Sequence, residues 1–356
     1  MHPNPNDLTH RLRMSVPGKG MLFGEYGVMS GGLAVVSALH SRRMTLDFEF
    51  CHSSQAEIIF ESEFLPVPLR VQPSNIAGLV ASAERSEKRN LACYVAGWQD
   101  SLADKSLRVR VTESFSPELG FGSSSALLVA FQVALLRLTD LVAQSAGSTP
   151  TKPQSFDRDF WQRIYAALLH LQSKGSGYDV AVQAAALQLP ISSASLASLF
   201  CFRNQGVKQK LFEPEVLPIA LSKEEFAQLG CFVQTGVRSD TRVVLAETQK
   251  IQSSDYFCRQ QNEWARSFCL EPTVQNAHRL CLEASKLSRE FGLLPATSDV
   301  LSFVQLCDRE GIAWKTMGAG HGDCLWVLAA QKDVEELIRR CGASSMSVAF
   351  SFAEGV

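Results

Sequence analysis

The first half of the chain contains several segments in which apolar and polar residues alternate. Residues 43–50 (RMTLDFEF), 56–60 and 107–112 (LRVRVT) alternate with a period of two, which is typical of strands with one buried face. Residues 13–37 place short apolar runs between glycines, and residues 196–202 (LASLFCF) form a strand-like segment. The pattern predicts a β-rich region that closes near residue 202.

Other segments have the spacing of helices. Helices are expected at 76–99, in the apolar stretch after residue 125, at 156–171, from about 178, at 274–291 and at 298–310. Residues 231–237 (CFVQTGV) predict a strand, and residues 314–329 predict a strand, a glycine turn and a second strand. The Gly-, Pro-, Ser- and Thr-rich residues 144–155 predict an exposed loop. Periodicity therefore indicates mixed α and β structure.

The length of the chain favours two domains. A single core rarely serves 356 residues, so we expect domains at 1–205 and 206–356 with a cleft between them. Basic and acidic residues nearly balance, at 34 and 36, for a net charge of -2. No overall field would draw the protein to nucleic acid or to an anionic membrane.

The sequence favours a cytoplasmic location. The N-terminal segment MHPNPNDLTHRLRMS lacks the apolar core of a signal peptide. Residues 126–138 are apolar but shorter than the ~20 residues of a membrane span, so they predict a buried helix. The ten cysteines are scattered from Cys51 to Cys341 without a C-x-x-C pair, which favours reduced core cysteines over a disulfide framework or a metal site.

The segment PELGFGSSSALL has the most direct chemical meaning. Gly120 and Gly122 allow the backbone to approach a ligand closely, and the helix that follows presents unpaired N–H groups and a positive dipole end to an anion. The hydroxyls of Ser123, Ser124 and Ser125 add donors, and one of them can bind the Mg²⁺ that accompanies ATP. The segment predicts a phosphate-binding loop.

Other interpretations of this loop are available. Many helices begin with a glycine and a serine N-cap and bind no ligand. The loop is not a Walker motif, because no Lys-Ser/Thr follows the glycines, and it is not a nucleophile elbow, because Ala126 stands where the last glycine belongs. Further motifs must therefore decide.

The segment VPGKGMLFGEYGVMSGG places Lys19 beside a turn formed by Pro17 and Gly18. An isolated surface lysine is the ordinary alternative. The segment SKGSGYDVAVQ places Asp179 at a helix start, where the dipole favours its ionised form. Although an Asp at this position is commonly structural, beside a phosphate loop it is a candidate to accept a proton from the attacking oxygen or to orient that oxygen.

The segment KTMGAGHGDC places Gly318, Gly320 and Gly322 at alternate positions, which suits a tight turn against a phosphate or another backbone. It lacks the G-x-G-x-x-G spacing of a dinucleotide-binding turn.

Taken in order, PGKGMLFGEYGVMSGG, PELGFGSSSALL and KTMGAGHGDC resemble the three signature motifs of the GHMP kinases, the superfamily of galactokinase, homoserine kinase, mevalonate kinase and phosphomevalonate kinase. The motifs span residues 17–324. Gly24-Glu25-Tyr26, HLQSKGSGYDVA and Gly322-Asp323-Cys324 look most like phosphomevalonate kinases. Mevalonate kinases more often have Gly-Glu-His, Pro-Ser-Gly-x-Asp-Asn and Gly-Gly-Cys at these places.

This resemblance implies the two-domain α+β GHMP kinase fold, with an N-terminal mixed-sheet domain, a C-terminal α/β sandwich domain and an active site between them. It implies transfer of phosphate from ATP to phosphomevalonate, a small anionic substrate, in the mevalonate pathway of isoprenoid biosynthesis, with ATP and Mg²⁺ as cofactors. Two alternatives stay open: a mevalonate kinase, and a non-catalytic sensor that binds ATP and a metabolite. The oligomeric state also stays open, a homodimer included.

The resemblance further implies a role for each matching position. Lys19 would lie beside the reacting oxygen, Asp179 would be the carboxylate on the acceptor side, and Ser124 would bind Mg²⁺ and phosphate. Contacts to the nucleotide are expected from Gly120, Gly122, Ser123, Ser124, Ser125, Gly318, Ala319 and Gly320. Contacts to the substrate are expected from Lys19, Glu25, Tyr26, Lys174, Ser176, Gly177 and Asp179.

The sequence departs from the family at three motif positions: Phe121 replaces Leu, Ser125 replaces Ala, and His321 replaces Gly. Mevalonate kinases supply a glutamate for the metal from the helix before the Ser-Gly-x-Asp turn, but that helix here reads IYAALLHLQSK, so no second carboxylate ligand can be assigned. If the acceptor is a phosphate, Lys19 and Lys174 are the nearest candidate cations, whereas Arg238 better fits a solvated surface charge.

Overall fold

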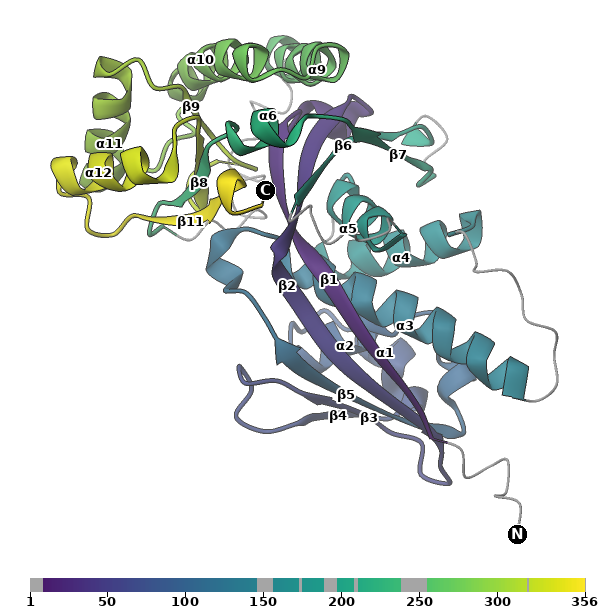
Figure 1. Ribbon diagram of the computed structural model, residues 1–356. Helices are drawn as coiled ribbons and strands as arrows, with labels where there is room; N and C mark the ends of the chain where they lie inside the picture. Colours follow the sequence, from purple (N-terminus) through teal and green to yellow (C-terminus); the bar gives the residue numbers. More distant parts are fainter. Residues whose placement is uncertain are drawn as a thin grey trace.

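The computed structural model describes residues 9–145, 156–172, 175–188, 197–207, 211–237, 255–318 and 320–355. Two sheets and the helices that cover them form a mixed α+β structure (Figure 1), which confirms the predicted fold class. The loop expected at 144–155 lies mostly outside the described residues.

The larger sheet has seven strands in the order β4-β3-β5-β2-β6-β7, with β1 also paired to β2. The strands are β1 (His10–Phe23), β2 (Ala34–His52), β3 (Ile58–Glu61), β4 (Leu69–Val71), β5 (Lys105–Glu113), β6 (Ala197–Asn204) and β7 (Pro214–Ile219). β3 and β5 are parallel and the other described pairs are antiparallel, so the sheet is mixed as predicted. β7 follows the expected boundary at residue 205 but pairs with β6, and the division into two domains stays a prediction.

The alternating pattern in β2 has the predicted physical cause. Leu46, Phe48 and Phe50 are buried, whereas Asp47 and Glu49 lie on the other face. The two acids pair across the strands with arginines of β1, and these exposed pairs add little stability. The apolar face of the strand therefore sets its register.

Helices cover one face of this sheet. They are α1 (Ile76–Ala81), α2 (Glu87–Tyr94), α3 (Ser123–Ser145), α4 (Arg158–Gln172) and α5 (Tyr178–Gln188), and Figure 1 shows α3, α4 and α5 side by side. The helical stretch expected at 76–99 contains two helices, α1 and α2, and not one continuous helix. The chain becomes extended at Ser82, and the Ser86 hydroxyl accepts a hydrogen bond from the Arg89 amide at 3.2 Å, so a second helix starts there.

α3 forms the centre of this half of the core. Among the described helices, only residues Ser123–Leu141 are long and apolar enough to cross a membrane by length and composition. Most of that stretch is buried, and α3 packs against β1, β2, α4 and α5. The buried helix expected at 126–138 is confirmed.

The smaller sheet has four antiparallel strands in the order β11-β8-β10-β9. The strands are β8 (Cys231–Gln234), β9 (Trp314–Thr316), β10 (Cys324–Val327) and β11 (Ser347–Ser351). The helices of this half are α6 (Lys223–Ala227), α9 (Asp255–Leu270), α10 (Val274–Glu290), α11 (Ser298–Arg309) and α12 (Gln331–Cys341). The predicted helices at 274–291 and 298–310 and the strand-turn-strand at 314–329 are confirmed.

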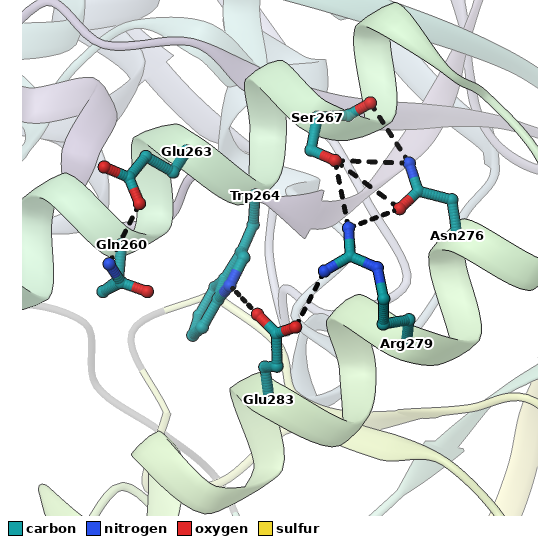
Figure 2. Close-up of polar contacts among 7 residues, drawn as sticks. All are labelled: Gln260, Glu263, Trp264, Ser267, Asn276, Arg279 and Glu283. Carbon is teal, nitrogen blue, oxygen red and sulfur yellow. Dashed lines mark hydrogen bonds and ion pairs between the residues drawn. The ribbon is translucent and has the colours of Figure 1, made fainter.

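A polar network joins α9 to α10 (Figure 2). The Trp264 indole donates to Glu283 Oε2 at 2.9 Å, and Arg279 donates to Glu283 Oε1 at 2.7 Å and to Asn276 Oδ1 at 2.8 Å. α9 in turn braces the turn after β1, because Asn262 Oδ1 accepts from the Leu33 amide at 2.9 Å. The hairpin of α9 and α10 therefore supports the first glycine-rich motif from outside.

The two sheets meet beneath the glycine-serine loop. Phe121 of that loop packs against Phe232 of β8 with ring centres 6.0 Å apart, and Phe23 of β1 packs edge-on against Trp326 of β10 at 5.3 Å. Gly20 leaves room for the Phe232 ring, since a Cβ at Gly20 would lie 2.3 Å from it. The loop is thus seated on both halves of the protein.

Candidate active site

Lys19 joins three of the predicted motifs. Its backbone amide donates to Phe121 O at 2.9 Å, and its ammonium donates to Gly120 O at 3.1 Å and to the Tyr178 hydroxyl at 2.9 Å. Phe121 and Gly120 belong to the glycine-serine loop, and Tyr178 begins α5 immediately before Asp179. The first motif, the loop and the start of α5 therefore lie together around one half-buried ammonium.

The surroundings of Lys19 preserve its charge. Burial alone would lower the pKa of this ammonium, but Tyr178, Asp179 and Asp323 act in the opposite direction, and the net pKa is raised. The pKa of the Tyr178 hydroxyl is also raised, in this case by burial, and Lys19 offsets only part of that shift. At neutral pH the site thus holds a protonated amine beside a neutral phenol.

The glycine-serine loop is shaped as the sequence predicts. Gly120 and Gly122 have φ of 67° and 77°, a left-handed conformation that favours glycine. A Cβ at Gly122 would lie 2.8 Å from Ser125 Oγ and 2.9 Å from Lys19 Cε. Ala126 N donates to Gly122 O at 2.9 Å, so the amides before Ala126 at the head of α3 have no partner within the helix. This is a cradle of the kind that binds phosphate.

The three serines of the loop have different surroundings. Ser124 is exposed and its hydroxyl bonds to the Tyr94 hydroxyl, whose pKa burial nevertheless raises. Ser123 is half-buried, whereas Ser125 is buried and donates to Gly122 O at 2.9 Å. Ser125 thus binds back to the backbone of the loop, and Ser123 and Ser124 are the serines that a ligand can reach.

The turn before β10 contacts the loop through residues that sequence reasoning did not select. Gly318 and Gly320 have φ of 60° and 80°, and Gly320 lies against Leu293, while Ala319 lies outside the described residues. Asp323 makes the contact instead, because a Cβ at Gly120 would lie 2.8 Å from its Oδ2.

The start of α5 is tied down on several sides. Gly177, with φ of 75°, is pressed against the Phe212 ring, which a Cβ there would approach to 2.4 Å. Ser176 is buried, Asp179 is half-buried, and Lys174 lies outside the described residues. Gln183, one turn on, donates to Pro17 O at 2.9 Å and to Gly122 O at 3.3 Å, which fastens α5 to both loops.

Two of the predicted substrate residues lie in the interior. Glu25 forms an ion pair with Lys315 of β9, and their side chains are only 5% and 2% exposed. Burial raises the pKa of Glu25, and Lys315 lowers it only in part. Tyr26 is 3% exposed and packs edge-on against Phe257 of α9 at 5.2 Å. Their predicted contact with substrate stays untested.

Comparisons with known proteins identify the fold. No family model matches the sequence, and a search of curated proteins found no match. Among solved structures, mevalonate kinase from Methanococcus jannaschii superposes with a TM-score of 0.65 at 17% identity over 95% of this chain and 97% of that one. The chain has the fold of the GHMP kinases.

Two further GHMP kinase structures have the same fold. Phosphomevalonate kinase from Streptococcus pneumoniae, in complex with phosphomevalonate and AMPPNP, gives a TM-score of 0.62 at 16% identity over 95% of this chain and 98% of that one. Lactococcus lactis galactokinase, complexed with galactose, gives 0.64 at 12% identity over 96% and 93%. The family resemblance drawn from the motifs is confirmed at the level of the fold.

The residues at the head of α3 fit a phosphate group with Mg²⁺ better than they fit a metal ion held by protein side chains alone. Gly122 lets the loop backbone lie close against Lys19 and Ser125, and the exposed Ser124 hydroxyl is an oxygen ligand of the type that Mg²⁺ prefers. Within the described ranges, no three His, Cys, Asp or Glu side chains are grouped to hold a metal ion. Such a donor set fits an ion held largely by phosphates and water.

Proposed function

We propose that this protein is a small-molecule kinase that transfers the γ-phosphoryl group of ATP to a small anionic acceptor, and that the acceptor is phosphomevalonate. The observation that carries the proposal is the convergence of Lys19, the Gly120 to Ser125 loop and the start of α5 around one ammonium. Phosphoryl transfer depends on alignment and charge neutralisation, and this arrangement supplies both.

The head of α3 would hold the nucleotide phosphates. The amides of its first turn have no partner within the helix, and Ser123 and Ser124 lie at its start, where the helix dipole adds a positive potential. ATP would supply the phosphoryl group, and Mg²⁺ bound by Ser124 and the phosphates would neutralise charge. A supporting role for Gly318, Ala319 and Gly320 stays a prediction from the sequence, since Gly320 lies against Leu293 and Asp323 contacts Gly120.

Lys19 and Asp179 would act on the reacting oxygens. The Lys19 ammonium is kept charged and is held by Gly120 and Tyr178, so it can stabilise the negative charge that develops during transfer. A phosphate acceptor is already ionised near neutral pH, and Asp179 would then orient it. A hydroxyl acceptor would need Asp179 as a base.

The acceptor assignment rests on sequence. Gly-Glu-Tyr at 24–26 and Gly-Asp-Cys at 322–324 favour phosphomevalonate over mevalonate. The phosphomevalonate kinase from S. pneumoniae, with its bound phosphomevalonate and AMPPNP, shares the fold.

An ADP-release assay with phosphomevalonate, mevalonate, homoserine and galactose tests the proposal. We expect the largest kcat/KM with phosphomevalonate. A preference for mevalonate would show that the acceptor assignment is wrong but that the protein is a kinase. ATP binding without ADP release for any acceptor would favour the sensor alternative.

Substitutions connect the activity to the site. Lys19→Ala and Asp179→Asn should each lower kcat by roughly 10²-fold while thermal stability stays within a few degrees of the unmodified protein. Near-normal turnover in both variants would remove these two residues from the proposed chemistry.

A further inference from the structure

Asp323 has a backbone conformation that side chains seldom adopt. Its φ is 50°, in the left-handed region where non-glycine residues are uncommon. The backbone is fixed on both sides: its amide donates to Val237 O at 2.6 Å, and its carbonyl accepts from the Thr235 amide at 2.8 Å and from Thr235 Oγ1 at 3.0 Å. The end of β8 therefore determines where the Asp323 side chain points.

That side chain points at the phosphate loop. A Cβ at Gly120 would lie 2.8 Å from Asp323 Oδ2 and 2.9 Å from Asp323 Cβ, so the carboxylate lies against the Gly120 backbone. Gly120 O is also the group that accepts a hydrogen bond from the Lys19 ammonium, at 3.1 Å. The neighbouring Cys324 thiol donates to Leu119 O at 3.3 Å and fixes the other side of the same turn.

The charged and titratable groups around Lys19 come from two different elements. Tyr178 and Asp179 approach from α5, and Asp323 approaches from the turn before β10. The Cys324 thiol also lies in the field of Lys19. The ammonium is therefore held between the two halves of the protein, and Asp323 is the carboxylate of the C-terminal half.

We propose that Asp323 is a positioning residue, whose carboxylate holds Gly120 and the Lys19 ammonium in place from the side of β10. Glycine would adopt this backbone conformation more easily, so an aspartate at position 323 costs backbone free energy that a glycine would not. The consequence for catalysis rests on the proposed kinase function, whereas the contact itself does not.

The first test needs no substrate. Competitive acetylation of the free protein over a range of pH, with Lys19 followed by mass spectrometry, reports the pH at which half of Lys19 is deprotonated. Asp323→Asn and Asp323→Gly should move that midpoint down by about half a pH unit or more, because each removes a nearby negative charge. Asp333→Asn, at an exposed position on α12, removes an equal charge and should leave the midpoint unchanged.

Stability separates positioning from a general structural role. Asp323→Gly should keep or raise the melting temperature, since glycine suits a positive φ. This variant also preserves the test if Asp323→Asn folds poorly. If the acceptor assay shows turnover, both variants should lower kcat about tenfold and change the KM for ATP less than about twofold.

The outcomes distinguish the two proposals. A lowered Lys19 midpoint in a protein that transfers phosphate to no acceptor would uphold the positioning role and reject the kinase. Normal turnover in the unmodified protein, with the Lys19 midpoint unmoved in both Asp323 variants, would overturn the positioning role and leave the kinase intact.

Discussion

The buried ion pair of Lys315 and Glu25 gives a sharp prediction about stability. Their side chains are 2% and 5% exposed, and the ammonium also donates to Thr316 O at 2.6 Å. In the part of the chain that the structure describes, Glu25 Oε2 has no hydrogen-bond partner. Lys315 is therefore the main group that favours the ionised carboxylate, with smaller contributions from the backbone of Gly24 and Glu25.

Lys315→Met keeps most of the side-chain volume and removes the charge. Breaking a buried pair in this way lowers the free energy of unfolding by about 3–5 kcal/mol. Protonation of Glu25 would remove the unpaired buried charge and so limit this decrease. That proton costs about 1.4 kcal/mol for each pH unit above an unfolded pKa of about 4.3, which is about 5 kcal/mol at pH 8 and about 1 kcal/mol at pH 5.

The sign of the pH dependence follows from the raised pKa of Glu25. The folded variant binds its proton more tightly than the unfolded chain, so stability is greatest below the unfolded pKa and falls as pH rises toward the folded one. The deficit of Lys315→Met should thus be large at pH 8 and small at pH 5.

Urea unfolding followed by tryptophan fluorescence at pH 5 to 8 measures this deficit. Glu25→Gln/Lys315→Met should recover most of it, because no charge is then left buried. Arg339→Met provides the control, since its pair with Glu336 is exposed and should contribute less than about 1 kcal/mol. A deficit below about 1 kcal/mol at pH 8, or one that does not shrink at pH 5, would refute the reasoning.

Two further predictions follow from the site and from β2. Ser124→Ala should raise the Mg²⁺ concentration for half-maximal activity about tenfold. Ser125→Ala should leave that concentration unchanged and lower the melting temperature, because Ser125 is buried and its hydroxyl donates to Gly122 O. Equal effects of the two substitutions on the Mg²⁺ dependence would contradict the assignment. Burial lowers the pKa of His40 from 6.5 to about 4. The free energy of unfolding should therefore be highest above pH 6.5 and fall as pH is lowered from 6.5 to 4, because the unfolded chain binds the proton more tightly. In urea unfolding, His40→Gln should lose less of its free energy of unfolding over this pH range than the unmodified protein.

The motifs could be found from the sequence because each depends on local chemistry. Gly120 and Gly122 have the positive φ that their residue type suggested, and Lys19 lies beside the loop. β2 and β5 could be predicted because their apolar and polar residues alternate, whereas β4 and β7 were not predicted. The break at Ser82 to Ser86 was missed, since helix propensity across it hides a serine cap.

The contacts that complete the site could not be predicted in this way. Gln183 reaches the loop and Tyr178 reaches Lys19 only because α5 packs beside α3 and β1. Lys315 gave a signal, a lysine next to a buried tryptophan in a predicted strand, but its partner Glu25 lies 290 positions away. Pairings over such distances are set by tertiary structure, which single-sequence patterns do not encode.

The loop at the head of α3 is expected to bind the phosphates of a nucleotide. Calorimetric titration of Mg·AMPPNP into the protein and into Gly122→Ala tests it most directly. We predict at least a tenfold weaker Kd for the variant, because the new methyl group would crowd Lys19 and Ser125 at a φ of 77°, and no change for Gly78→Ala, where a Cβ meets nothing within 4 Å. Equal affinity of Gly122→Ala and the unmodified protein, or no binding by either, would contradict the account.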